Sequence, residues 1–164
     1  MLICKKYFSK FTVMKFTPLN LPKAKLKLKD DLIWCILRKK YILNTPEEWV
    51  RQHFIHHLIN DLKYPVGLMA SEKVVKYNNM SKRCDIVSFS NTLKTLMIVE
   101  CKAPKIKLTE DVFYQIAKYN FTLKAPLLIL TNGLQHIAAF VDVKNNEVKF
   151  LEKLPTFDEN LKMV

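Results

Sequence analysis

The sequence predicts a single α/β domain in which helices flank a central mixed β-sheet. Three observations predict this class: two stretches with helix-start chemistry, several short apolar runs bounded by turn residues, and one run, "APLLILTN", that is apolar on both faces. The length of 164 residues and the 49% apolar content suffice for one core. We expect a basic, irregular arm over residues 1–22 and one domain over residues 23–164.

The first half of the domain is expected to form a hairpin followed by a helix. "AKLKLK" alternates apolar residues with lysine, and "LIWCIL" follows after two aspartates, a pattern typical of a β-hairpin. In "NTPEEWVRQHFIHHLINDL", Thr45 is the expected N-cap and Pro46 the first helical residue. A helical wheel places Glu47 inside the apolar face and Glu48 on its edge. At least one of these two acids is therefore expected to point inward.

The second half alternates strands with one further helix. Strands are expected in "SEKVVKY", "CDIVSF", "LMIVECK", "HIAAFVDV" and "EVKFLEKL", with turns at Asn78-Asn79 and Asn145-Asn146. "LTEDVFYQIAKYNFTLK" has Thr109 as its expected N-cap and predicts a helix. "APLLILTN" predicts a fully buried strand that lies parallel to a neighbour.

Charge and composition narrow the possible partners. Residues 1–29 hold eight of the 27 basic residues and none of the 15 acidic ones, so the formal charge of +12 is concentrated at the N-terminal end. Such an arm is either simply solvated or contacts nucleic-acid phosphate. With two glycines, the chain has no phosphate-cradling loop, so no nucleotide cofactor is expected. No apolar run approaches membrane-spanning length and no secretory signal is present, which favours a cytoplasmic location and no membrane partner.

The end of the "LMIVECK" strand carries the candidate chemistry. Residues two apart in a strand share a face, so Glu100 and Lys102 project together and Cys101 projects away. If the two strands form an antiparallel hairpin centred near Leu93, Asp85 lies across from them. Paired carboxylates repel unless a cation lies between them, and Mg²⁺ or Mn²⁺ suits such oxygen ligands. The alternative is an ordinary ion pair at a strand end.

The motifs "RCDIV", "MIVECKAP", "FYQIAKYN" and "LILTNGLQH" resemble the N-terminal nuclease domain of the type I restriction enzyme R subunit, a branch of the PD-(D/E)XK nuclease superfamily. "TPEEWVRQ" is similar to the first helix of short stand-alone members. The resemblance runs from about residue 21 to about residue 154. It implies a restriction-endonuclease-like core and Mg²⁺-dependent hydrolysis of DNA phosphodiester bonds, without the translocase of a full subunit.

The resemblance also implies roles for individual residues. Asp85, Glu100 and the backbone carbonyl of Cys101 would be metal ligands, and Lys102 the catalytic lysine. One helix acid would join them, either Glu47 or Glu48: the helical wheel favours Glu47, and the spacing to Val50-Arg51 fits Glu48 about as well. A further pair, Gln115 and Tyr119, matches a QxxxY motif and would face the site or the nucleic acid. Nucleic-acid contacts are expected from Arg51, Lys82, Arg83, Lys105, Lys118 and Asn132.

One departure from the family pattern and two rival functions remain. Cys84 stands where the superfamily motif has proline, which this branch tolerates. DNA is the expected partner, together with other proteins of a restriction system. The rivals are a non-catalytic module that binds nucleic acid or protein on the nuclease fold, and a nuclease that acts on RNA.

Overall fold

The computed structural model describes residues 16–163 except 78–79, 143–144 and 146, and leaves out the side chains of residues 75–77, 80, 82, 118–119 and 121–123. The expected turns at Asn78-Asn79 and Asn145-Asn146 thus lie wholly or partly outside the described residues. The elements follow in this order: β1 (Leu28–Lys29), β2 (Leu32–Cys35), β3 (Lys40–Leu43), α1 (Pro46–Asn60), a 3₁₀ turn η1 (Val66–Leu68), β4 (Met69–Tyr77), β5 (Met80–Phe89), β6 (Thr95–Cys101), α2 (Glu110–Leu123), β7 (Leu127–Thr131), β8 (His136–Asp142), β9 (Glu147–Phe150) and α3 (Phe157–Lys162).

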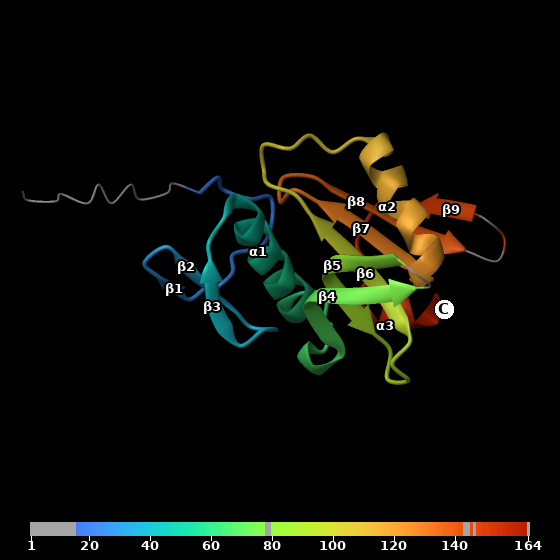
Figure 1. Ribbon diagram of the computed structural model, residues 1–164, viewed down its shortest axis with the longest axis horizontal. Coiled ribbons are helices and arrows are strands. Elements are labelled where there is room, and N and C mark those ends of the chain that lie inside the picture. Colours follow the sequence, from blue (N-terminus) through green and yellow to red (C-terminus); the bar gives the residue numbers. More distant parts are fainter. Residues whose placement is uncertain (1–15, 78–79, 143–144, 146, 164) are drawn as a thin grey trace, which may run out of the picture.

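Two sheets organise these elements, as Figure 1 shows. The small sheet has the order β1-β2-β3, and the large one the order β4-β5-β6-β7-β8-β9. Strands β6 and β7 are parallel, and α2 provides the crossover between them that a parallel pair requires. All other described strand pairs are antiparallel. The expected mixed α/β class is thereby confirmed, including the parallel strand in "APLLILTN".

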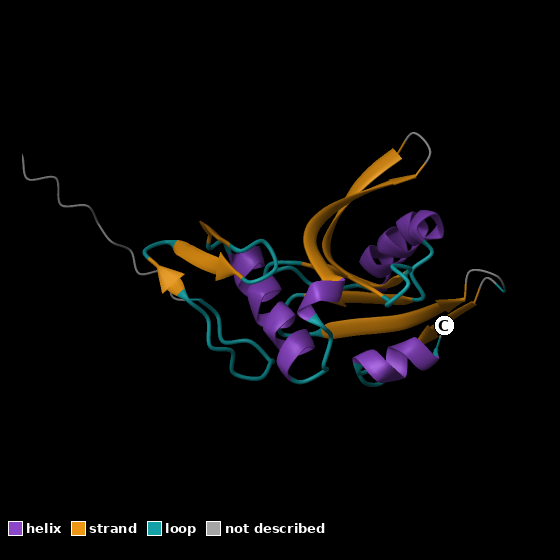
Figure 2. Cartoon of the chain, turned by 90° about the horizontal axis from the view of Figure 1, so that it is seen from below, coloured by secondary structure: helices purple, strands orange, loops and turns teal. Residues whose placement is uncertain are grey.

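Helices cover both faces of the large sheet. Side chains of α1, including Val50 and Phe54, pack with Val99 of β6 and with Phe157 of α3 in one apolar cluster. A second cluster on the opposite face joins α2 to the alternate residues of the same strands, such as Ile98. Figure 2 shows α2 and α3 on opposite sides of the sheet, with the β4–β5 hairpin curling toward the α2 side. None of the described helices is long and apolar enough to cross a membrane.

Local capping chemistry fixes the helix starts. The hydroxyl of Thr45 accepts a hydrogen bond from the Glu48 N–H, and that of Thr109 accepts one from Val112. The short helix α3, which the sequence reading did not predict, begins with a full capping box between Thr156 and Glu159. Strand β3 was not predicted either; it extends the expected β1–β2 hairpin into a third strand.

The described part of the expected arm is docked onto the domain. The ring of Phe16 stacks on Trp49 of α1 with centroids 4.6 Å apart, and the Asn20 N–H donates to the Gly133 carbonyl at 2.7 Å. Gly133 has a φ of +80°, and a Cβ there would lie 2.7 Å from a methyl carbon of Leu19. Glycine at this turn therefore lets residues 16–21 lie against the β7–β8 connection.

Candidate functional site

The candidate site lies where β5 and β6 stop pairing. After a register shift between Ser88 and Phe89, the ladder between them is regular up to the Ile86–Val99 pair. One residue beyond, the Asp85 carboxylate enters the gap: its Oδ2 accepts a hydrogen bond from the Cys101 N–H at 2.7 Å. Its Oδ1 accepts one from Nη2 of Arg51 at 2.9 Å. Asp85 thus joins the end of β6 to helix α1.

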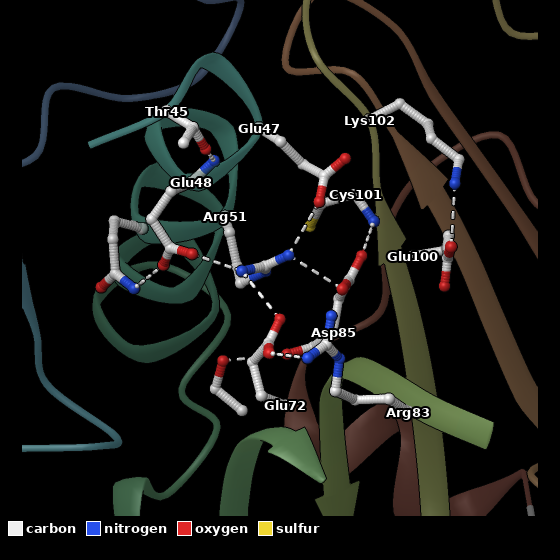
Figure 3. Close-up of polar contacts among 12 residues, drawn as sticks. Thr45, Glu47, Glu48, Arg51, Glu72, Arg83, Asp85, Glu100, Cys101 and Lys102 are labelled. Atoms are coloured by element: carbon white, nitrogen blue, oxygen red, sulfur yellow. Dashed lines mark hydrogen bonds and ion pairs between the residues drawn. The ribbon is translucent and has the colours of Figure 1, made fainter. Parts of the chain in front are cut away.

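Arg51 is the charged centre of this region. Its guanidinium forms ion pairs with Glu47 at 3.0 Å, with Glu72 of β4 at 3.1 Å, with Asp85, and with Glu48. Figure 3 shows the guanidinium surrounded by these carboxylates. Its side chain is only 5% exposed. Burial alone lowers the pKa of Arg51, but the neighbouring charges, that of Asp85 first, outweigh burial and raise the pKa above its ordinary value.

The two helix acids occupy different environments. Glu48 is buried, and its carboxylate also accepts hydrogen bonds from Arg38 at 3.0 Å and from the amide of Gln52 at 2.7 Å. Glu47 is 44% exposed and contacts Arg51 from the rim. The wheel placed Glu47 deeper, but the more buried acid is Glu48, because guanidinium and amide donors compensate its charge there. Both acids lie on the Arg51 side of the site.

Glu100 and Lys102 form the second charged unit. Their ion pair is 2.9 Å long. Strand alternation puts Glu100 on the same face as Ile98, toward α2, whereas Cys101 joins Val99 on the α1 face. In Figure 3 this pair lies on the other side of β6 from Arg51. Burial lowers the pKa of Lys102, but its hydrogen bond to Glu100 and the negative charges of Glu100, Asp85 and Glu47 together outweigh burial and raise the pKa, so the ammonium is charged at neutral pH.

The carboxylates of Asp85 and Glu100 supply the oxygen ligands that a hard divalent cation such as Mg²⁺ prefers. Burial raises the pKa of Asp85 to about 6; Arg51 opposes the rise and Glu100 adds to it. In this conformation, however, each oxygen of Asp85 accepts a hydrogen bond from the protein, and Cys101 turns its N–H rather than its carbonyl to that carboxylate. In the part of the chain that the structure describes, no three His, Cys, Asp or Glu side chains are grouped to hold an ion.

The remaining predicted residues are spread more widely. Gln115 is exposed on α2, and Lys105 is exposed in the loop after β6. Arg83 is exposed and pairs with Glu72 at 3.1 Å. Asn132 is buried; its amide donates to the Ile106 carbonyl at 2.8 Å, and its carbonyl oxygen accepts two N–H bonds within the turn. The side chains of Lys82, Lys118 and Tyr119 lie outside the described residues.

Three residues of the site were missed from the sequence: Glu72, Arg38 and Gln52. For Gln52 a signal was available, because it lies four residues after Glu48 on the same helical face. Glu72 adopts a positive φ of 57° within β4, a conformation that is strained for a non-glycine residue. In the sequence, only its position as the single acid of a predicted strand hinted at a role for Glu72. Its contact with α1 is a tertiary contact, which residue spacing does not reveal.

The chain was compared with curated proteins, solved structures and protein-family models. No curated protein matches the chain. Among solved structures, a fragment described as an HsdR subunit of a type I restriction enzyme from Vibrio vulnificus shares 20% identity, over 58% of this chain and 20% of that chain, with a TM-score of 0.41. The chain thus spans about a fifth of that chain's length. Residues 46–155, which include every site element from α1 to α2, match the model of the family "Type I restriction enzyme R protein N terminus", so the chain belongs to that family.

Proposed function

We propose that this chain is a metal-dependent nuclease domain with a PD-(D/E)XK core that hydrolyses phosphodiester bonds of DNA. The observation that carries the proposal is the arrangement at the end of the β5–β6 pairing. There the Asp85 carboxylate accepts a hydrogen bond from the N–H of Cys101, and the residues on either side of Cys101 are the ion-paired Glu100 and Lys102. Membership of the restriction-enzyme family supports this reading. DNA would be held mainly through its phosphates, and further proteins of a restriction system are the proposed partners.

The proposed site has two parts: the ligands of a metal ion and a lysine that stabilises negative charge on the phosphate. Asp85, Glu100 and the Cys101 carbonyl would hold Mg²⁺ or Mn²⁺, which when bound polarises the phosphate and makes a water a better nucleophile. A water would attack phosphorus and give up a proton to solvent, while the bond from phosphorus to the leaving sugar oxygen would break and that oxygen would take up a proton. Lys102 places its ammonium beside the charge that grows on the phosphate, which lowers the barrier. Glu100, which accepts a hydrogen bond from Lys102 at 2.9 Å, orients that ammonium.

The test is cleavage by the purified full chain. Plasmid DNA, single-stranded DNA and RNA are each incubated with Mg²⁺, with Mn²⁺ and with EDTA. We expect cleavage of DNA that requires the cation and that disappears in Glu100→Gln. The exposed Glu152→Gln is the matched control and should cleave as the unmodified protein does. Cleavage that resists EDTA, or full activity of Glu100→Gln, would contradict the proposal, and cleavage confined to RNA would correct its substrate.

A second candidate function is favoured by one observation. The buried Arg51 guanidinium already neutralises Asp85, as a non-catalytic ionic network would. On this view the chain binds nucleic acid or a protein partner and cleaves nothing. Binding of labelled duplex DNA that is unaffected by EDTA, by Mn²⁺ and by Glu100→Gln, without cleavage under any condition, would favour this module over the nuclease.

A further inference from the structure

Arg51 occupies the position from which a cation would neutralise Asp85. The guanidinium reaches carboxylates from three elements: two on its own helix, one on β4 and one on β5. Its two terminal nitrogens make all of these contacts, while the buried Nε has no hydrogen-bond partner among the described residues. Oδ1 of Asp85, 2.9 Å from Nη2, is therefore covered by a positive charge that belongs to the protein.

Two cations compete for that carboxylate. A guanidinium and a divalent ion within contact distance of one oxygen repel each other strongly in a buried environment. The ion can therefore bind Asp85 well only if Arg51 moves away from Oδ1. Arg51 keeps Glu47, Glu48 and Glu72 as partners when it does so, and its charge stays compensated.

The charge balance of the cluster also allows for another cation. Four carboxylates face three guanidiniums, because Arg38 pairs with Glu48 and Arg83 with Glu72 in addition to the contacts of Arg51. One negative charge is in excess. Release of Asp85 from Arg51 places that excess within β5, at the point where its pairing with β6 ends.

We propose that Arg51 is a positioning residue that acts as a resident counter-cation: it holds Asp85 when no metal is bound and competes with the metal for it. The affinity for the divalent ion is then set by how easily the guanidinium leaves Asp85. This inference rests on the proposed function, since it takes Asp85 to be a metal ligand.

The experiment measures Mn²⁺ binding to the full chain by calorimetry and, in parallel, its effect on melting temperature. Arg51→Met removes the competitor, so Mn²⁺ should bind at least about tenfold more tightly than to the unmodified protein. The variant should melt at a lower temperature without metal and recover much of the loss when Mn²⁺ is added. Arg51→Lys keeps a charge but cannot bridge four carboxylates, so its Mn²⁺ affinity should lie between those of the unmodified protein and Arg51→Met. It replaces Arg51→Met in the test if that variant does not fold.

Arg38→Met is the matched control. Arg38 contacts Glu48 at 3.0 Å and the thiol of Cys35, so its loss removes a guanidinium from the same cluster without uncovering Asp85. We expect a lower melting temperature that Mn²⁺ does not restore, and unchanged Mn²⁺ affinity. Adding Asp85→Asn to Arg51→Met should abolish the gain in affinity.

The outcomes separate the two proposals. Equal Mn²⁺ affinity in the unmodified protein and in the Arg51 variants would overturn the inference and leave the nuclease standing. Failure of every variant to bind Mn²⁺ at millimolar concentration would overturn the metal-dependent function itself. Recovery of melting temperature in Arg38→Met to the same extent as in Arg51→Met would also overturn the inference, because the effect would then be a general response of the acidic cluster.

Discussion

On the α1 side of β6, the buried guanidinium of Arg51 contacts four carboxylates, whereas on the α2 side Lys102, whose side chain is 30% exposed, pairs with Glu100 alone. A buried charge with many partners is tied to the stability of the fold, because losing one partner leaves another charge uncompensated. A partly exposed charge with one partner contributes little to stability and can turn to a substrate. The two charged groups adjoin the same strand, yet mutations in them should have different effects, on stability in the first and on cleavage in the second.

The buried unit should give the largest effect on stability. Glu48→Ala leaves Arg38 and Gln52 without their buried acceptor and removes one partner of Arg51, so we expect a loss of about 3 kcal/mol in the free energy of unfolding. Glu47→Ala, at the rim of the same arginine, should cost less than about 1 kcal/mol. Urea denaturation of both variants measures the difference. Equal losses would mean that burial does not distinguish these two acids.

The partly exposed pair of Glu100 and Lys102 should show the opposite: a large effect on cleavage and a small one on stability. Lys102→Met removes the ammonium from the proposed reaction site, so single-turnover cleavage should slow by roughly a hundredfold or more, while unfolding changes by less than about 1 kcal/mol. Lys107→Met, an exposed lysine five residues further on that is not among the expected nucleic-acid contacts, is the control and should affect neither quantity much. A large loss of stability in Lys102→Met would remove the contrast between the two sides of β6.

A smaller effect is expected on α2. Gln115 is exposed, so Gln115→Ala should leave the melting temperature nearly unchanged. If its amide donates to a phosphate, cleavage at limiting DNA should fall by about tenfold, the size expected for one hydrogen bond to a charged group. Tyr114→Phe, at the neighbouring exposed position, is the comparison. Equal activity of both variants and the unmodified chain would place the QxxxY pair outside the site.

The smallest effect should come from the lysines that precede β1 or lie in it. Replacing the exposed Lys23, Lys25, Lys27 and Lys29 by Gln should leave the maximal cleavage rate unchanged and flatten the dependence of DNA affinity on salt. The logarithmic slope should fall by up to about 3.6 if each lysine neutralises one phosphate. Lys149→Gln and Lys153→Gln, exposed near the other end of the chain, provide the control for general charge loss. An unaltered slope would mean that these four lysines are only solvated.

Local signals in the sequence were enough for most of the fold. Thr45 and Thr109 mark helix starts, because each hydroxyl accepts a hydrogen bond from the backbone N–H three residues later. The apolar character of "APLLILTN" marks a buried parallel strand. Helix α3 also had such a signal, since Thr156 and Glu159 form a capping box, but only six residues follow the cap and no helical period can develop. Strand β3 has one partner, β2, and little apolar alternation, so its pairing is not visible locally.

The sequence predicted some of the residues that meet in this cluster, but neither Glu72, Arg38 and Gln52 nor the arrangement of the whole. Spacing along β6 predicts that Glu100 and Lys102 share a face, and their ion pair agrees. The environment of Asp85 depends on Arg51, which is 34 residues away in sequence and approaches from another layer. Glu72 enters the same cluster through a backbone conformation that no sequence pattern indicates. Long-range contacts of this kind follow from packing, and single-residue spacing carries no information about them.

The close approach of Leu19 to Gly133 has a consequence for local unfolding. A methyl group at position 133 would meet the Leu19 side chain at 2.7 Å and would also strain a backbone with φ of +80°. None of residues 16–21 is fully buried, so Gly133→Ala should open this segment long before the sheet melts. Limited proteolysis would then cut between residues 16 and 21 in the variant and spare the unmodified chain, while the core of the domain remains protease-resistant.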